Sequence, residues 1–222
     1  MHCTQKITPT IHWVGGNDRR IALFENMFPL TNGVCYNSYL IMDEKITLMD
    51  TVDSAITAQF FENLTYVLNG KSIDYLVVNH MEPDHCANIE ELARRYPNMK
   101  LVGNKKTFQM FEQFYDMDIR ERYLEVKDGD TLNLGSHTLK FILAPMVHWP
   151  EVMVAYDSFD KILFSADGFG KFGALDTDED WACEARRYYF NIVGKYGAQV
   201  QALLKVAATL DIQIICPLHG PI

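Results

Sequence analysis

Two imidazoles and two carboxylates stand close together directly after an apolar run at 75–78. That run is short and rich in β-branched and aromatic residues, which predicts a buried strand. Residues 88–96 predict a helix, with Asn88 placed to cap its start. Pro83 disfavours helical geometry at the preceding residue, so we expect a turn between strand and helix. A loop of this kind commonly presents functional side chains. The two imidazoles and two carboxylates in this loop are those of His80, Glu82, Asp84 and His85.

Imidazole and carboxylate are the ligands of first-row transition metals, so these four side chains could converge on one or two ions. The alternative is a solvated polar loop, because a short window dense in such residues also arises by chance. The window 176–181 is an example. It holds no histidine and suits a solvated helix start.

Three more apolar runs are each followed by a ligand-type residue. The run 141–145 leads to His148, 161–166 to Asp167, and 212–217 to His219. A single residue of this kind is more often a turn residue or a satisfied polar group. Three of them after predicted strands, beside a four-ligand loop, favour a shared metal site.

The other histidines do not follow a strand in this way, and we interpret them as structural or exposed: His2, His12 in a strand-like stretch, and His137 in a predicted turn. The chain has five cysteines, an odd number, and no C-x-x-C motif. This argues against a disulfide framework or a zinc knuckle and is typical of reduced thiols. Cys86 and Cys216 lie near ligand loops in sequence. We interpret both as small buried hydrophobes, with a role in the chemistry as the less favoured alternative.

Four motifs together resemble those of the diiron domain of flavodiiron proteins, a branch of the metallo-β-lactamase superfamily. They are His-x-Glu-x-Asp-His at 80–85, His-Trp-Pro at 148–150, Ser-x-Asp-x-Phe-Gly at 165–170 and His-Gly-Pro at 219–221. The segment 23–40 also resembles that family's N-terminal strands. The resemblance implies an α/β (α+β) fold, the metallo-β-lactamase-like αββα sandwich, with metals at one edge and a single diiron domain over 1–222.

The resemblance also implies two iron ions (Fe²⁺/Fe³⁺) joined by a bridging oxo or hydroxo group. His80, Glu82 and His148 would hold one ion, Asp84, His85 and His219 the other, and Asp167 would bridge them. Zinc hydrolases of the superfamily typically have a histidine where this chain has Glu82. A carboxylate there raises the oxygen content of the site, which suits iron or manganese better than zinc.

Length and patterning agree with a layered fold. A chain of 222 residues, 48% of them hydrophobic, can bury one sizeable core. Strands and helices interspersed along the chain indicate an α/β or α+β domain. We expect strands near 35–42, 45–50, 75–79, 138–144, 152–157, 161–166 and 212–216. We expect helices near 54–67, 88–96, 105–114, 179–193 and 197–208.

Several classes of function are disfavoured. The formal charge of −9 argues against nucleic acid. No run approaches the roughly 20 apolar residues of a membrane span, and the N-terminus lacks the apolar core of a secretory signal, so we expect a cytoplasmic protein. The segment 168–173 fits G-x-G-x-x-G. No helix pattern follows it at once, so we expect a loop beside the metal site, not a dinucleotide site.

The function implied by the resemblance depends on the supply of electrons. Flavodiiron proteins carry a flavodoxin domain whose FMN reduces the irons, whereas this chain ends three residues after His219, so we expect no FMN here. Two ferrous ions hold two electrons, and reduction of O2 to water takes four. The chain is therefore predicted to bind dioxygen as a sensor or binding module, similar to the standalone oxygen-binding diiron proteins of bacterial chemotaxis signalling.

Two alternatives stay open. The chain could be an O2 or nitric oxide reductase subunit that takes electrons from a separate flavin or rubredoxin partner. A zinc hydrolase with a metal-bound nucleophile is the less favoured alternative, and Glu82 argues against it. Partners are thus expected to be dioxygen or NO and an electron-donor or signalling protein. The family forms head-to-tail dimers, so a homodimer is compatible with either function.

Overall fold

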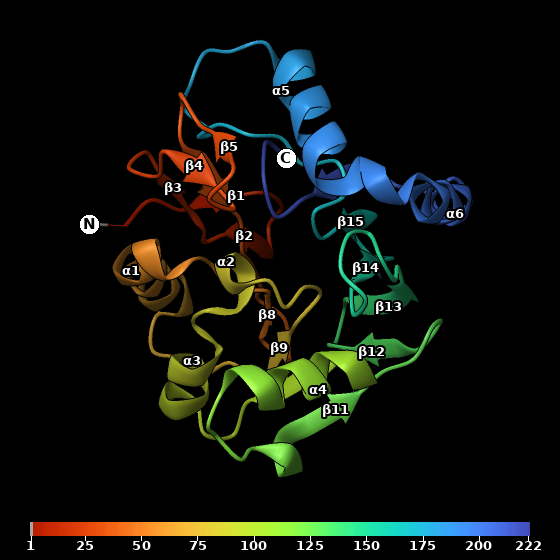
Figure 1. Cartoon of the computed structure of the whole chain (residues 1–222). Helices are drawn as coiled ribbons and strands as arrows, with labels where there is room; N and C mark the ends of the chain where they lie inside the picture. Colours follow the sequence, from red (N-terminus) through yellow and green to blue (C-terminus); the bar gives the residue numbers. More distant parts are fainter. Residues whose placement is uncertain (1) are drawn as a thin grey trace.

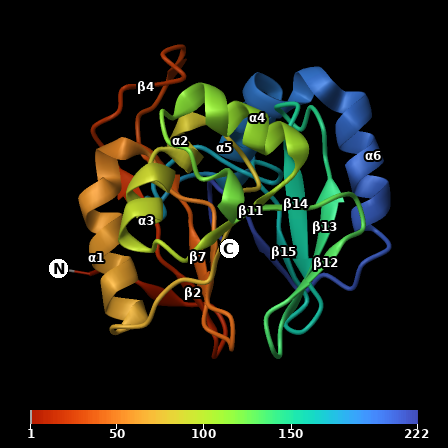
Figure 2. The same cartoon turned by 90° about the horizontal axis from the view of Figure 1, so that it is seen from below.

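Two β-sheets lie face to face between two layers of helices (Figure 1, Figure 2). The structure is a computed structural model that describes residues 2–222. The first sheet has the order β1-β2-β7-β8-β9-β10-β11, and the second has the order β12-β13-β14-β15-β16. The first comprises β1 Gln5–Lys6, β2 Ile11–Trp13, β7 Tyr39–Ile41, β8 Thr47–Met49, β9 Tyr75–Val77, β10 Lys100–Gly103 and β11 Tyr123–Glu125. The second comprises β12 Thr131–Asn133, β13 Thr138–Leu143, β14 Met153–Asp157, β15 Ile162–Phe164 and β16 Ile214–Cys216.

Alternation along the strands explains the layers, because successive side chains of a strand point to opposite faces. In the second sheet, Phe141 and Phe164 belong to the core between the sheets. Their neighbours Ile142 and Leu163 face the other way, into the core that includes Leu203 of the outer helices. Both faces of each sheet are therefore buried, as in an αββα sandwich, and the predicted fold class is confirmed.

Helices cover the outer faces of the two sheets (Figure 2). On the side of the first sheet lie α1 Thr57–Leu68, α2 Pro83–Cys86, α3 Ile89–Arg95 and α4 Lys105–Phe114. On the side of the second lie α5 Trp181–Tyr188, a π-helical turn Tyr189–Val193 and α6 Gly197–Ala207. Phe60, Leu64 and Phe111 are fully buried beneath the first layer. Among residues 2–222, no helix is both long and apolar enough to cross a membrane.

Most predicted elements are present, with some corrections. The expected strand 35–42 is two strands in different sheets, β6 Val34–Tyr36 and β7. The break falls at Asn37, whose buried side chain accepts a hydrogen bond from Trp13 and donates to the carbonyls of Pro217 and Gly220. The helix expected at 179–193 changes from α to π geometry at Tyr189. Several short strands were not predicted: β1, β2, three strands between residues 16 and 29, β10, β11 and β12.

The helix start expected at the acidic window 176–181 is present, whereas the predicted cap at Asn88 is wrong. Asp180 caps α5, since its side chain accepts hydrogen bonds from the backbone N–H groups of Ala182 and Cys183. Asn88 precedes α3 but does not cap it. Its amide instead donates to the carbonyl of Val52, and its oxygen accepts from Thr57. Asn88 therefore ties α3 to the start of α1.

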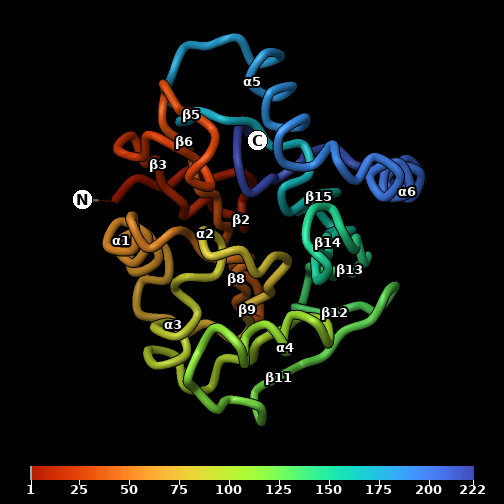
Figure 3. The backbone as a smooth tube through the Cα atoms, in the orientation of Figure 1, coloured from red at the N-terminus to blue at the C-terminus, as the bar shows by residue number. Residues whose placement is uncertain are grey.

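The strand directions bring several loops to one edge. β8 and β9 are parallel, as are β15 and β16. Their carboxyl ends lead to Asp50, to the loop 79–82, to Asp167 and to His219. Two small two-stranded sheets, β3 Gly16–Asp18 with β6 and β4 Leu23–Phe24 with β5 Phe28–Pro29, lie beside this edge (Figure 1, Figure 3).

Candidate metal centre

The predicted ligand loop begins where β9 ends and is held by a buried carboxylate. Asp50 accepts hydrogen bonds from the backbone N–H groups of Asn79 and His80 and from the side-chain amide of Asn79. Glu82 is extended, with ψ of 142°, as the following proline predicts. The prediction that the whole motif is a turn was wrong, because Pro83–Cys86 forms one turn of helix. Proline is favourable at the first position of a helix. Pro83 therefore keeps Glu82 out of the helical conformation and is itself the first residue of α2.

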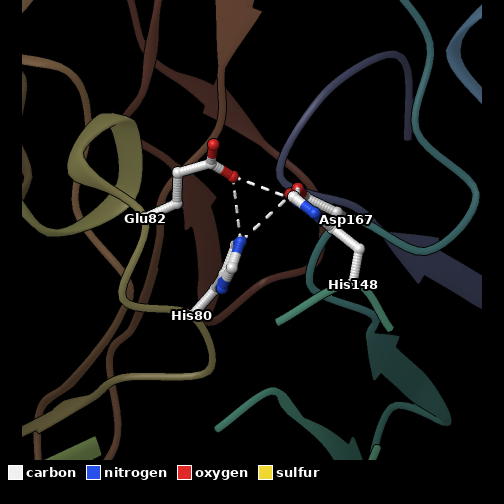
Figure 4. A group of neighbouring side chains, drawn as sticks. All are labelled: His80, Glu82, His148 and Asp167. Atoms are coloured by element: carbon white, nitrogen blue, oxygen red, sulfur yellow. Dashed lines mark hydrogen bonds and ion pairs between the residues drawn. The ribbon is translucent and has the colours of Figure 1, made fainter. Parts of the chain in front are cut away.

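The first group of side chains brings together four of the seven predicted ligands (Figure 4). His80 Nε2 lies 3.1 Å from Glu82 Oε2 and 3.6 Å from Asp167 Oδ2. His148 Nε2 lies 3.0 Å from each of the same two oxygens. His80 and Glu82 come from the loop after β9, whereas His148 and Asp167 come from loops of the second sheet. The group therefore forms only when the two sheets pack.

The second group holds the remaining three, Asp84, His85 and His219. Asp84 Oδ2 lies 3.4 Å from His85 Nε2 and 3.3 Å from His219 Nε2. The two imidazole nitrogens are 3.0 Å apart. Asp167 Oδ1 lies 3.2 Å from His85 Nε2, while its other oxygen contacts His148. Asp167 thus touches both groups, one with each oxygen.

Two histidines are oriented by their outer nitrogens. His80 Nδ1 donates to Glu151 Oε1 at 2.8 Å, and His219 Nδ1 donates to the carbonyl of Cys35 at 2.8 Å. With Nδ1 committed to these acceptors, Nε2 is the nitrogen that faces the other ligands and that a metal can bind in place of a proton. Buried partners of this kind fix the tautomer and ring orientation of metal-binding histidines. Both rings therefore present the nitrogen that a metal needs.

The geometry of the cluster fits metal ions. Two ligand atoms at about 2.1 Å from one ion and at right angles are about 3.0 Å apart, close to the distances found here. Both oxygens of Asp84, one of Asp167 and Nδ1 of His85 are buried without a hydrogen-bond partner among residues 2–222. A buried polar atom left unpaired costs free energy, and a bound cation would satisfy these oxygens. The side chains present therefore suit two adjacent ions.

In the absence of metal, protons hold the carboxylates and imidazoles together. Burial disfavours ionisation of Glu82, but hydrogen bonds from His148 and His80 hold its pKa below the usual value. Burial lowers the pKa of His148, but Asp167 and Glu82 outweigh it and raise that pKa to about 9. Burial opposes the charge of Asp167 as well, yet His85 and His148 hold its pKa well below 3.8. On the solvent side, burial and the neighbouring Glu82 raise the pKa of Glu25 to about 7.

Three residues that support the cluster were missed from the sequence: Asp50, Glu151 and Tyr188. Asp50 is the last residue of the strand predicted at 45–50 and directly follows the observed β8, a position like that of Asp167, so it could have been found. Glu151 is fully buried and follows the His-Trp-Pro motif, but nothing local indicates its bond to His80. The Tyr188 hydroxyl is buried without a hydrogen-bond partner among residues 2–222. Burial and the nearby Asp167 raise its pKa well above 10.

The residues set aside from the sequence lie outside the cluster. His2 is exposed and stacks on Tyr66, and His12 lies in β2. His137 is structural as predicted, but it is fully buried: Nδ1 bonds Asp157 at 3.0 Å and Nε2 bonds Thr10 at 2.8 Å. Cys86 and Cys216 are buried, as predicted. The segment 168–173 forms a loop with no helix at its start, and its Phe169 is 45% exposed.

An αββα sandwich with a histidine and carboxylate cluster at one edge defines a metallo-β-lactamase-like domain. Residues 34–220 match the family described as "ODP family beta lactamase". The chain therefore belongs to the ODP family of β-lactamase-like domains.

The relatives of the chain are flavodiiron proteins, and the match covers their diiron domain only. The chain is 34% identical to the anaerobic nitric oxide reductase flavorubredoxin of Vibrio vulnificus, over 98% of its own length and 46% of the relative. The flavodiiron protein of Giardia intestinalis superposes with a TM-score of 0.92 at 32% identity, over 99% of this chain and 55% of that one. Rubredoxin oxygen:oxidoreductase of Desulfovibrio gigas superposes with a TM-score of 0.89 at 31% identity, over 98% of this chain and 56% of that one. The chain thus spans about half the length of each.

Proposed function

We propose that the seven clustered side chains hold two iron ions: one on His80, Glu82 and His148, the other on Asp84, His85 and His219, with Asp167 bridging. The observation that carries the proposal is Asp167, which contacts a histidine of each group through a different oxygen, at 3.0 Å and 3.2 Å. Three carboxylates leave a small positive surplus on two ferrous ions, which an exogenous anion or hydroxide would neutralise. The carboxylate of Glu82 favours iron over a hydrolytic zinc centre.

The ligand that we propose for this centre is dioxygen. A cavity of about 260 Å³ opens beside Asp167 and is otherwise mostly apolar. Its walls include Val147, Phe169, Trp181 and Leu203. A neutral diatomic gas can enter such a space without a desolvation penalty, whereas a charged or strongly polar substrate would lose its hydration there. The unpaired hydroxyl of Tyr188 lines the same cavity and can donate a hydrogen bond to a bound ligand.

Oxygen binding is proposed to serve sensing. When bound, the two ferrous ions supply two electrons, half of what reduction of dioxygen to water requires. The protein's own residues place apolar groups beside the ligand position: Trp149 packs against His80 with ring centroids 5.4 Å apart, and the apolar cavity opens beside Asp167. A centre shielded in this way favours a lasting oxygen-bound state over turnover.

The second candidate is an O2 or NO reductase that receives electrons from a flavin or rubredoxin partner. The observation in its favour is the kinship with proteins described as nitric oxide reductase and oxygen oxidoreductase. Both candidates use the same centre and differ in whether electrons are resupplied.

The test is anaerobic loading with Fe²⁺, metal analysis, and visible spectroscopy before and after oxygen. The proposal expects about two irons per chain and an absorption band that persists after oxygen is added. Asp157→Asn, which alters a buried carboxylate away from the cluster, should behave like the unmodified protein, whereas Asp167→Asn should lose the band. Rapid oxygen or NO consumption with an added flavin or rubredoxin reductase, without a lasting band, would support the reductase. One zinc with esterase turnover would overturn both.

A further inference from the structure

The cluster has a second opening, whose chemistry is opposite to that of the apolar cavity. A pocket of about 210 Å³ lies between the β4–β5 hairpin, the start of α1 and the ligand loop. Its lining includes four carboxylates, those of Glu25, Asp53, Glu82 and Asp84. We call this opening the acidic mouth. Figure 3 shows the hairpin on the same side of the molecule as α5 and the C-terminus.

The acidic mouth is where the proposed ligands approach solvent. Glu82 and Asp84 are each 8% exposed, whereas His148 is 3% exposed and the other four are 1% or less. These two carboxylates belong to different groups, so the mouth leads to both proposed ion positions. Asp84 is nine-tenths buried, and neither of its oxygens has a hydrogen-bond partner among residues 2–222. Asp84 Oδ2 lies 3.4 Å from His85 Nε2 and 3.3 Å from His219 Nε2, contacts that a shared cation would replace. A buried carboxylate without hydrogen bonds, at the base of an acidic opening, indicates a cationic ligand.

The outer part of the mouth carries two more carboxylates that are not proposed ligands. Glu25 is exposed at the tip of the β4–β5 hairpin. Asp53 is half-buried, and one of its oxygens caps the backbone N–H of Ala55. Within residues 2–222, no lysine or arginine forms an ion pair with Glu25, Asp53, Glu82 or Asp84. Glu82 and Asp84 face the histidines of the cluster, so the outer carboxylates set the charge of the mouth once Glu25, whose pKa is raised to about 7, is ionised. At such a pH, a cleft lined by carboxylates raises the entry rate of cations.

We propose that the acidic mouth is the entry port for divalent cations, with Glu25 and Asp53 as transient ligands ahead of Glu82 and Asp84. The apolar cavity cannot serve this purpose, because a hydrated cation would have to shed water against Phe169, Trp181 and Leu203. The port rests on the proposed metal centre but not on dioxygen chemistry. Ion entry and gas entry are thereby assigned to different faces of the cluster.

The experiment follows Co²⁺ uptake by the metal-free full chain in a stopped-flow spectrometer, with the metal alone as the probe. At pH 8, above the raised pKa of Glu25, Glu25→Gln combined with Asp53→Asn should slow uptake about tenfold at low salt, within the range known for electrostatic steering. The difference should shrink near 1 M salt, where screening extends over only about 3 Å. The final number of cobalt ions bound should stay unchanged, since neither residue is a resident ligand.

The matched control is Asp116→Asn combined with Glu121→Gln, two exposed carboxylates near β11 that remove the same two charges. It should load like the unmodified protein. A steric pair adds an independent check: Ile21→Trp narrows the mouth and should slow uptake, whereas Leu204→Trp narrows the apolar cavity and should not.

Each contrary result overturns the port. Unchanged uptake in the Glu25 and Asp53 variant would place entry elsewhere, and equal slowing in the control would mean that only total charge matters. A lower final cobalt number, with unchanged circular dichroism, would make the two residues resident ligands. Failure of the dioxygen proposal is separate, because it would leave the uptake rates and the bound metal unaltered.

Discussion

Glu151→Gln tests whether a residue that touches no proposed ion nonetheless controls one of them. Glu151 is fully buried, accepts from His80 Nδ1 at 2.8 Å and also accepts from the backbone N–H of Met81 at 2.8 Å. Burial lowers the pKa of His80, but Glu151 and then Glu82 outweigh it and raise that pKa well above 6.5, so His80 carries a proton in the metal-free protein. A divalent ion that replaces this proton adds about one unit of positive charge near Glu151.

The magnitude follows from Coulomb's law. Through the imidazole ring, the carboxylate of Glu151 is roughly 7 Å from an ion bound at His80 Nε2. The attraction between the Glu151 carboxylate and one additional unit of positive charge at that distance, in an effective dielectric of about 20, is about 2 kcal/mol. Losing this attraction would lower the affinity for the ion about thirtyfold. This agrees with the 10- to 100-fold range typical of residues that orient a metal-binding histidine. The glutamine retains an acceptor for His80, so loss of charge is the main change.

Competitive titration of the metal-free protein with Co²⁺ and a chelator measures the effect. One of the two binding steps should weaken about thirtyfold, and the step at Asp84, His85 and His219 should change little. Asp157→Asn is the matched control, because Asp157 is also fully buried and bonded to a histidine, His137, at 3.0 Å. Unchanged binding by Glu151→Gln, or equal weakening by the control, would refute the reasoning.

Three other outcomes can be measured. Asp167→Asn should lose more bound metal than His80→Ala, because one carboxylate contacts both groups; equal losses in metal analysis would show that it does not bridge. Metal uptake near pH 7.5 should release protons to an indicator dye, since His148 has a pKa raised to about 9, and uptake without release would contradict this. His137→Gln should lower the free energy of unfolding by about 1–3 kcal/mol near pH 5.5 and by less near pH 9. Burial lowers the pKa of His137, but Asp157 outweighs it and raises the pKa above 6.5, so the stabilisation is complete below 6.5 and lost as pH rises through the folded-state value. A loss that denaturation curves show to be independent of pH would mean that His137 stays neutral.

The sequence predicted those features that depend on neighbours along the chain. Four apolar runs gave four strands, and the polar residues after them gave all seven side chains that the structure brings together. The extended conformation of Glu82 followed from the proline after it. Charge patterning at 176–181 predicted a helix start, which Asp180 caps. Each of these features is set by local propensity and the period of the hydrophobic pattern.

Other local predictions failed where tertiary contacts outweighed propensity. Asn88 has a capping residue's chemistry, yet its side chain bonds Val52 and Thr57 instead. The short strands β1 to β5 carry too few residues for a period to be recognised, and pairing with distant partners defines them. Asn37 splits an otherwise continuous apolar stretch because its side chain reaches Pro217 and Gly220, about 180 positions away.

Only the packing of the two sheets decided the centre itself. His80 and His219 are fully buried, and the residues that orient them come from other elements: Glu151 accepts a hydrogen bond from His80, and the carbonyl of Cys35 accepts one from His219. Neither partner carries a recognisable local signal, because a hydrogen bond between residues 71 or 184 positions apart depends on the register of whole strands. The sequence specifies which donor atoms exist. The donor atoms come within about 3 Å of one another because burial of the apolar faces packs the two sheets together, and this packing places the loops at their strand ends side by side.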